Sequence, residues 1–375
     1  MVMHVEIISK EIIKPSSPTP HHLRNFKLSF LDQITPSLYI PIIFFYHSNH
    51  GVGVDPFERS RSLKKSLAET LTRFYPLAGA PINEDFSINC NDKGADYIEA
   101  RVPCKLSQVV DNPKAQELIQ LLPFEPHHSC TEIGKEVLLA VQYNIFECGG
   151  VAIAVCVSHK IADGTSAVTF VNAWAGTSRG ASEVISPSFD AAIHFPLRDT
   201  TGFMPNEAIS KENIAISAFI WRRFMAMAKA KQGNKKPKLF AAVHAVNLRE
   251  RMVPQLPVHS FGNLWRFAIA TSLVEIEKDC CFLVRQLRNA IMEINSEYVK
   301  KLQDSDGHLD FMKKTSKQLV EGEIELFIPC KNVVVMMSTK DGDGIEMWIN
   351  MKEEDMAMFE HDPELLSLAT LANGE

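Results

Sequence analysis

Residues 151–180 read VAIAVCVSHKIADGTSAVTFVNAWAGTSRG, and this segment is the most informative part of the sequence. It starts with a continuous apolar run, Val151 to Val157, whose length and β-branched residues are typical of a strand buried on both faces. Beyond a short polar turn, apolar side chains recur at helical spacing: Ala167, Phe170, Val171 and Trp174. The stretch therefore predicts a buried strand followed by a helix, as in an α/β fold.

The polar turn carries the pattern His159-x-x-x-Asp163-Gly164. The pattern predicts His159 at the end of the strand and Asp163 as the N-cap of the helix, and ligands of open α/β sheets bind at such strand ends. An imidazole with an ordinary pKa of about 6.5 is largely neutral at pH 7 and accepts protons, which favours general-base catalysis by His159. Two roles stay open for Asp163, contact with the ring or capping of the helix. A merely structural histidine beside an ordinary cap stays open too.

The composition narrows the class of protein. The 375 residues are 46% hydrophobic and 22% charged, with a formal charge of −6 at pH 7, which indicates a globular chain and disfavours a nucleic acid partner. The longest apolar stretch, Leu38 to Tyr46, is broken by Pro41 and is roughly half of a membrane span. The N-terminus also lacks the apolar core of a signal peptide, so we expect no membrane association.

The cysteines favour a reducing compartment. They form no CxxC pair and show no histidine spacing typical of zinc, so we expect no metal site. Several lie in apolar runs, as buried free thiols do. The eight positions are Cys90, Cys104, Cys130, Cys148, Cys156, Cys280, Cys281 and Cys330. We therefore expect a soluble cytosolic protein.

The chain is expected to contain two domains, residues 1–182 and 214–375. Residues 183–213 are proline-rich and lack strong periodicity, which predicts a crossover between them. In the second domain the pattern predicts a helix through Ser217–Lys231, a strand through Lys238–Leu248, helical stretches near 279–303 and 310–320, and a hairpin of Asn332–Ser338 with Ile345–Asn350 around Asp341-Gly342-Asp343-Gly344.

With these motifs in place, the chain resembles the plant BAHD acyltransferases, in particular their vinorine synthase-like branch. The segment HKIADG (159–164) is similar to the His-x-x-x-Asp-Gly signature of that family. Other segments similar to family landmarks follow in family order: IKPSSPTP (13–20), LDQ (31–33), FYPLAG (74–79), CND (90–92), FECGG (146–150), AVNLR (245–249) and SFGN (260–263). The resemblance covers nearly the whole chain.

The resemblance implies a two-domain, chloramphenicol-acetyltransferase-like α/β fold, each domain a mixed β-sheet with flanking helices. It implies that His159 is the general base in a channel between the domains, and that Asp163, with Gly164 beside it, supports the site by pairing with Arg249. Asn263 corresponds to a position linked to CoA binding. The implied partners are an acyl-CoA co-substrate, expected to be acetyl-CoA, and a small alcohol such as an alkaloid or terpenoid. No permanently bound cofactor and a monomer are implied.

Two departures from the family pattern affect the second domain. The family's Asp-Phe-Gly-Trp-Gly signature is absent, and almost no chain remains between Phe327 and the strand at Asn332 where relatives carry it. Phe203–Asn213 also runs almost directly into the next helix, where relatives insert a strand and a helix. We therefore expect an incomplete second domain. A catalytically silent paralogue with only a binding role is the alternative to an active transferase.

Two further patterns have competing interpretations. Gly176-Thr177-Ser178-Arg179-Gly180 is a literal G-x-S-x-G, and Asp190 and His194 follow in the order of an α/β-hydrolase, but the helical pattern entering Ser178 disfavours a nucleophile elbow. A basic run is more typical of a solvated helix end than of a CoA phosphate site. Its members are Arg222, Arg223, Lys229, Lys231, Lys235, Lys236 and Lys238.

Overall fold

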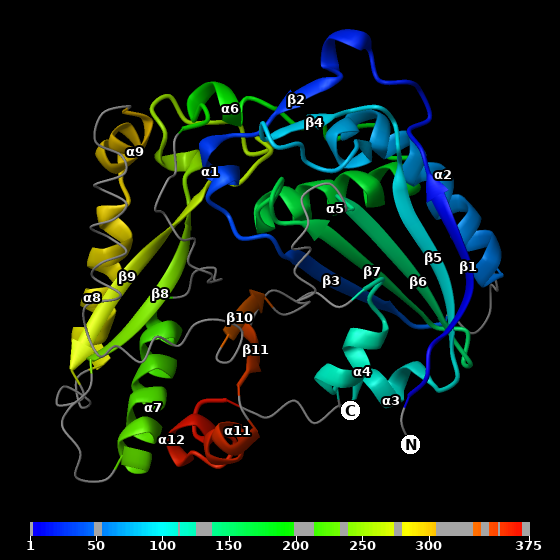
Figure 1. The fold of residues 1–375 in the computed structure, drawn as a ribbon. Coiled ribbons are helices and arrows are strands. Elements are labelled where there is room, and N and C mark those ends of the chain that lie inside the picture. Colours follow the sequence, from blue (N-terminus) through cyan, green and yellow to red (C-terminus); the bar gives the residue numbers. More distant parts are fainter. Residues whose placement is uncertain are drawn as a thin grey trace. The chain divides into compact units, whose positions relative to one another are not determined.

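The computed structural model divides the chain into two compact units (Figure 1). The described residues are 3–48, 55–111, 113–124, 137–198, 214–232, 239–273, 280–304, 333–338, 345–351 and 353–369. The first unit comprises the positions up to 199 together with Pro257–Asn263, and the second comprises Thr200–Leu256 and Leu264–Ala372. The first unit therefore includes a short segment that is distant from the rest of it in sequence.

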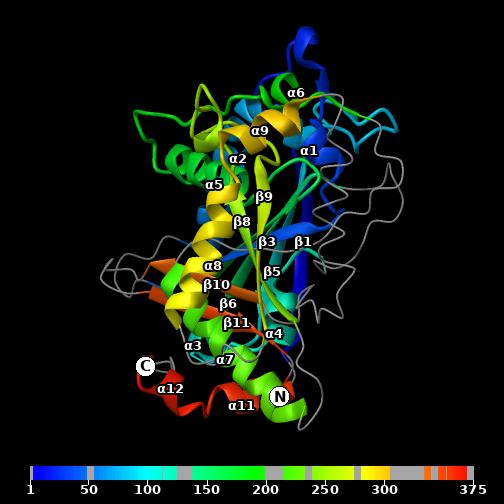
Figure 2. The same ribbon diagram turned by 90° about the vertical axis from the view of Figure 1, so that its left-hand side faces the viewer.

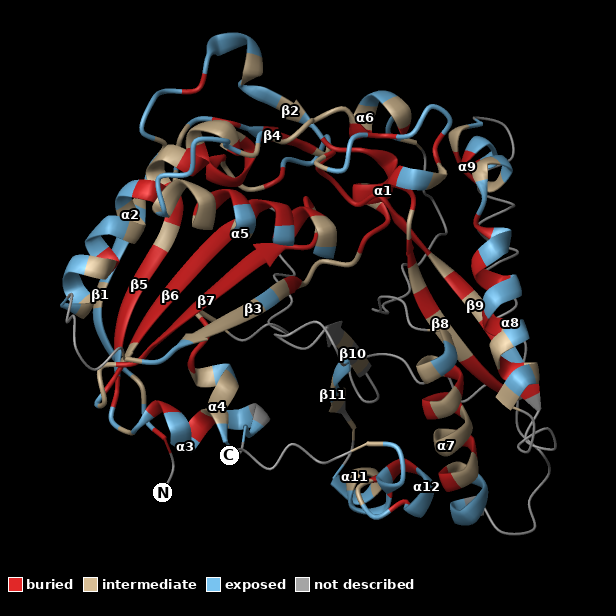
Figure 3. Cartoon of the chain, turned by 180° about the vertical axis from the view of Figure 1, so that it is seen from behind, coloured by how far each residue is buried: buried red, intermediate tan, exposed pale blue. Residues whose placement is uncertain are grey.

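A five-stranded mixed sheet forms the centre of the first unit. Its order is β1-β5-β6-β7-β3, and only β5 and β6 pair in parallel. The strands are β1 (Glu6–Ile13), β3 (Tyr39–Tyr46), β5 (Ala95–Val102), β6 (Leu139–Phe146) and β7 (Val151–Ser158). Every residue of β7 is buried, which confirms the prediction from the apolar run (Figure 3). β3 lies at the edge of the sheet, where the missing amide hydrogen of Pro41 is tolerated.

Two long helices, α2 (Pro56–Arg73) and α5 (Gly164–Ser178), cover one face of this sheet. The predicted apolar stripe of α5 packs here, with Phe170 and Trp174 in the same core as Leu71 of α2 and Val155 of β7. The shorter elements of the unit are η1 (His21–Leu23), β2 (Asn25–Lys27), α1 (Phe30–Gln33), η2 (Tyr75–Ala78), β4 (Ser87–Asn89), α3 (Leu106–Val110), α4 (Ala115–Gln120) and α6 (Ala191–His194).

The other face of the sheet is packed by α3 and by the chain that follows α4. Leu106 and Val109 of α3 share a cluster with Phe146 of β6. Two buried amides also tie α4 to β6: Gln142 Nε2 donates to Gln120 O (3.1 Å), and Asn144 Nδ2 donates to Leu121 O (2.9 Å). These bonds satisfy polar groups that would otherwise be costly to bury.

Residues 257–263, called here the returning segment, join the first unit by main-chain bonds and by one aromatic side chain. Ser188 N donates to His259 O (3.0 Å), and Phe261 N donates to Ser188 O (2.7 Å). The Phe261 ring is buried and makes edge-on contacts with Phe74 (ring centroids 5.8 Å apart) and Phe189 (5.5 Å). The returning segment is therefore part of the hydrophobic core of this unit.

The second unit contains two antiparallel strand pairs in its described part, β8 with β9 and β10 with β11. Helix α8 packs against β9, and α7 packs against α8 (Figure 2). The elements are α7 (Ile214–Gln232), β8 (Leu239–Asn247), η3 (Arg249–Arg251), β9 (Trp265–Leu273), α8 (Cys280–Glu293), α9 (Ser296–Gln303), β10 (Val333–Ser338), β11 (Ile345–Asn350), α11 (Glu353–Phe359) and α12 (Pro363–Leu366).

Several predictions for this unit are confirmed, namely α7, β8, the helices at 280–303 and the hairpin of β10 and β11. The expected helix near 310–320, the turn at Asp341–Gly344, the segments flanking the two departures, and Cys130 and Cys330 lie outside the described residues. None of the helices in the described ranges is long and apolar enough to cross a membrane.

Candidate active site

His159 follows the last residue of β7, as the sequence predicts. Its main-chain amide donates to Leu38 O (2.8 Å), which continues the pairing of β7 with the chain leading into β3. The side chain is buried, and its Nδ1 lies 2.9 Å from the carbonyl oxygen of Ala162. Because a carbonyl oxygen only accepts hydrogen bonds, Nδ1 carries the hydrogen, and the lone pair of the neutral ring is on Nε2.

The surroundings keep this imidazole neutral. Burial lowers the pKa of His159 below its ordinary value, because the charged ring would lose its hydration, and this effect outweighs the opposing influence of the Ala162 carbonyl and the Asp163 carboxylate. The ring is therefore in the proton-accepting form at neutral pH. That is the state which general-base catalysis requires.

Asp163 caps helix α5. Its Oδ1 accepts a hydrogen bond from Ser166 N (2.8 Å), and its backbone is extended, as in an ordinary N-cap. Of the two roles left open by the sequence, the structure shows the capping one, which fixes the turn between His159 and α5. Gly164 is the first residue of α5, and a Cβ atom there would meet nothing within 4 Å, so packing does not require glycine at this position.

Replacing Asp163 tests the capping role. Asp163→Ala is expected to lower the free energy of unfolding by about 1 kcal/mol, whereas Asp163→Asn retains a side-chain acceptor and is expected to cost much less. Urea unfolding of both variants measures the difference. If the asparagine variant loses as much stability as the alanine variant, the charge of Asp163 is what matters, and capping is not its main role.

Asn263, the last residue of the returning segment, binds the backbone of His159. Asn263 Nδ2 donates to His159 O (2.6 Å) and to Asp32 Oδ1 (2.9 Å), and Asn263 N also donates to Asp32 Oδ1 (2.9 Å). The preceding Gly262 exchanges two hydrogen bonds with Ser166 of α5, whose Oγ donates to Gly262 O (3.0 Å) and accepts from Gly262 N (3.1 Å). The returning segment thus forms hydrogen bonds with both ends of the turn from His159 to Ser166.

Glycine is required at position 262 for these hydrogen bonds to form. Its φ of +137° lies where side chains are rarely tolerated, and an added Cβ would come within 3.0 Å of Ala191 Cβ. The sequence predicts Asn263 as a residue on the CoA side, and that role stays a prediction. Its contact with His159 was not predicted.

Comparison with known proteins identifies the family to which the chain belongs. The Transferase family is matched over residues 3–215 and 205–328. The chain belongs to this family, the BAHD acyltransferases. The two matched ranges overlap at 205–215, at the end of the predicted crossover, where the sequence indicates a missing strand and helix.

This BAHD acyltransferase is similar over nearly its whole length to several plant acyltransferases. It is 37% identical to stemmadenine O-acetyltransferase of Catharanthus roseus, over 96% of this chain and 97% of the relative. It is 37% identical to vinorine synthase of Rauvolfia serpentina, over 98% of both chains, and 31% identical to limonoid 21-O-acetyltransferase of Melia azedarach, over 97% and 98%. The first alignment spans 415 residues, more than this chain contains, so the relative carries segments that are missing here.

The fold of this acyltransferase is also that of vinorine synthase. The crystal structure of that enzyme matches with a TM-score of 0.81 and 35% identity, over 99% of this chain and all of the other. The predicted chloramphenicol-acetyltransferase-like fold is therefore confirmed.

Arg249 of the acyltransferase lies in the second unit, in η3, and its side chain is buried. Its main-chain N and its Nη1 both donate to Asn247 Oδ1, each at 3.1 Å. Asn247 thus holds the arginine in place at the end of β8. The pairing of Arg249 with Asp163 stays a prediction.

The serine hydrolase interpretation is wrong for this acyltransferase. Gly176 and Ser178 both lie within α5, and Ser178 is its last residue. A nucleophile elbow requires a strand that enters the serine and a helix that leaves it, whereas here a helix enters. The glycines belong to the end of a helix.

The basic run on α7 forms ion pairs within the second unit. Arg222 pairs with Glu364, Arg223 pairs with Asp362 and Glu364, and Lys231 pairs with Asp355. These arginines and this lysine connect α7 to α11 and α12, which neither interpretation of the run anticipated. Lys235, Lys236 and Lys238 lie outside the described residues.

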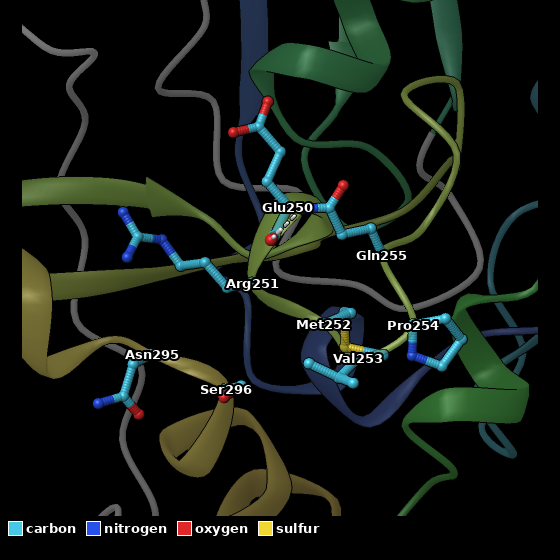
Figure 4. A pocket seen from close by; sticks show the side chains of 8 residues that line it. All are labelled: Glu250, Arg251, Met252, Val253, Pro254, Gln255, Asn295 and Ser296. Carbon is cyan, nitrogen blue, oxygen red and sulfur yellow. Dashed lines mark hydrogen bonds between the residues drawn. The ribbon is translucent and has the colours of Figure 1, made fainter.

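A surface pocket of about 420 Å³ lies in the second unit (Figure 4). It is lined by residues 250–255, which include the cis Val253-Pro254 peptide, and by Asn295 and Ser296. Arg251 Nη1 donates to Ile291 O (3.3 Å) and Ile294 O (2.8 Å) at the end of α8. The Arg251 guanidinium thus binds the carbonyl groups at the end of α8. The pocket lining contains none of the predicted site residues.

Proposed function

We propose that this chain is an acetyl-CoA-dependent O-acetyltransferase that uses His159 as general base. The observation that carries the proposal is the hydrogen bond from His159 Nδ1 to Ala162 O, which directs the lone pair to Nε2. The lowered pKa of the buried ring supports the same role. Membership of an acyltransferase family supplies the class of reaction.

The reaction proceeds by direct transfer. The acceptor hydroxyl oxygen attacks the thioester carbonyl carbon, and Nε2 takes the hydroxyl proton as the carbon–oxygen bond forms. The tetrahedral intermediate then collapses, the carbon–sulfur bond breaks, and the imidazolium returns the proton to the leaving CoA sulfur. The products are an acetate ester and free CoA, and the ring is again neutral.

The acceptor is proposed to be an alkaloid or terpenoid alcohol. The relatives named above include an acetyltransferase of stemmadenine and one of a limonoid, and they cover nearly the whole chain. The chain is further proposed to act as a cytosolic monomer without a permanently bound cofactor. The six cysteines in the described part of the chain are free thiols, which is consistent with a reducing compartment.

The test is an acetyl-transfer assay with the full chain. The purified protein is incubated with acetyl-CoA and a panel of indole-alkaloid and terpenoid alcohols, while free CoA thiol and acetylated product are measured. Acceptor-dependent release of CoA together with the matching ester is expected. If acetyl-CoA binds but is never consumed with any acceptor of either class, the silent-paralogue alternative is correct.

A further inference from the structure

Asp32 lies at the centre of a buried hydrogen-bond network that reaches the main-chain carbonyl of His159. Its carboxylate accepts four hydrogen bonds, two on each oxygen. Oδ2 accepts from Ser29 N (2.7 Å) and Ser29 Oγ (2.6 Å), and Oδ1 accepts from Asn263 N and Nδ2 (both 2.9 Å). The side chain is buried, and all four donors are neutral. A carboxylate in such a place is costly, and burial raises the pKa of Asp32.

The two oxygens have different tasks. The Ser29 side forms a capping box, in which Ser29 Oγ also accepts from Asp32 N (3.2 Å), and this arm starts the short helix α1. The Asn263 side holds the backbone and the side-chain amide of one residue in the returning segment. Only this second arm leads to His159, through the Nδ2–O bond of 2.6 Å.

We propose that Asp32 is a positioning residue, which acts through Asn263 to hold the backbone of His159 in place. This inference rests on the proposed role of His159 as general base. Asn263 Nδ2 has two hydrogens, and Asp32 Oδ1 takes one of them. The amide is thereby oriented so that its other hydrogen points at the His159 carbonyl. That carbonyl belongs to the same turn as Ala162, whose oxygen orients the imidazole ring.

Small displacements of a general base lower the rate of the reaction strongly. A misplacement of about 1 Å can reduce the rate about 100-fold, because proton transfer needs a defined geometry. The His159 carbonyl is bound by Asn263, while the His159 amide is bound by Leu38 O. Without the Asp32–Asn263 arm, one of these two restraints is lost, and water enters beside the ring.

The experiment combines kinetics with a direct measurement on the ring. Asn263→Ala, Asp32→Asn and the double variant are compared with the wild-type chain for kcat and KM of acetyl transfer, and the His159 pKa is measured by NMR on protein labelled at histidine Cε1. His159→Ala assigns the signal. Asp163, whose charge acts on the ring, and Lys160, which follows His159 in sequence, are unchanged in every variant.

Asn263→Ala and Asp32→Asn are each expected to lower kcat about 10- to 100-fold, and the double variant is expected to be no slower than Asn263→Ala alone. The His159 pKa is expected to rise toward its ordinary value as the ring becomes hydrated. In Asn263→Ala this rise opposes the loss of the Asn263 side-chain hydrogen bond, because that bond by itself raises the pKa of His159. In Asp32→Asn this rise opposes the effect of removing a negative charge, which by itself lowers the pKa of a nearby histidine. A rise there therefore reports loosening of the turn.

Ser29→Ala is the matched control, because it removes both hydrogen bonds of Ser29 Oγ in the capping arm and leaves the Asn263 arm intact. It is expected to lower Tm but to leave the His159 pKa and kcat near the wild-type values. The proposal is overturned if Ser29→Ala reproduces the loss of kcat, if the effects of Asp32→Asn and Asn263→Ala multiply, or if the His159 pKa does not rise. The NMR measurement needs no turnover, so it decides the proposal even if the chain transfers no acetyl group.

Discussion

His159→Ala is expected to lower kcat for acetyl transfer by about 100- to 10,000-fold, the range typical of a lost general base. The acceptor hydroxyl must then lose its proton to water while it attacks the thioester. KM for acetyl-CoA is expected to change little, because the imidazole contributes to the transition state rather than to donor binding. Steady-state release of CoA thiol at saturating acceptor measures the loss.

Two controls separate this effect from damage to the fold. His159→Gln retains a side-chain donor that can bond to the Ala162 carbonyl, but it provides no base, so it is expected to be about as slow as the alanine variant. His194→Ala removes a half-exposed histidine of the same unit and is expected to retain wild-type kcat. A His159→Ala variant with undiminished turnover would contradict the proposed mechanism.

Phe261→Ala is expected to lower the free energy of unfolding by about 3–5 kcal/mol, the range found for a fully buried phenylalanine. The ring is 1% exposed and contacts Phe74 and Phe189 in the core of the first unit. Since Gly262 and Asn263 follow directly, we also expect acetyl transfer to fall in the fraction of molecules that remains folded. Urea unfolding and activity at low temperature measure the two effects.

Phe146→Ala is the matched variant for this prediction. Phe146 is 2% exposed and packs with Leu106 and Val109 on the opposite face of the sheet. A similar loss of stability is expected, without loss of specific activity in the folded fraction. Equal specific activities of the two variants would show that the returning segment does not support the site.

The local part of the site was predictable from the sequence. The strand β7, the position of His159 at its end and the cap at Asp163 follow from apolar runs and capping preferences that act over a few residues. The α/β fold class was predictable for the same reason, because a fully buried strand followed by an amphipathic helix is a strong local pattern. These predictions did not depend on knowing which distant segments meet.

The Asp32–Asn263 contact was not predictable in this way, because its partners are 231 residues apart. Ser29-x-x-Asp32 has the pattern of a helix-capping box, and that signal indicates only the start of α1. Nothing in the local pattern around Phe261 shows that it leaves its neighbours in sequence to join the core of the first unit. The ion pairs of α7 were missed for the same reason, because their acidic partners lie more than a hundred residues downstream.

The returning segment has a consequence for how the protein is made. When the ribosome has translated the chain up to position 199, the strand, the histidine and the cap all exist, but Asn263 and Phe261 do not. At about 5–20 residues per second, the missing partners follow roughly 3–13 s later. During that interval, Asp32 lacks two of its four hydrogen-bond donors, and the core of the nascent first unit lacks the Phe261 ring. A fragment that ends at position 199 would stay in that condition permanently, so we expect that a native first unit cannot be obtained by cutting the chain at that position.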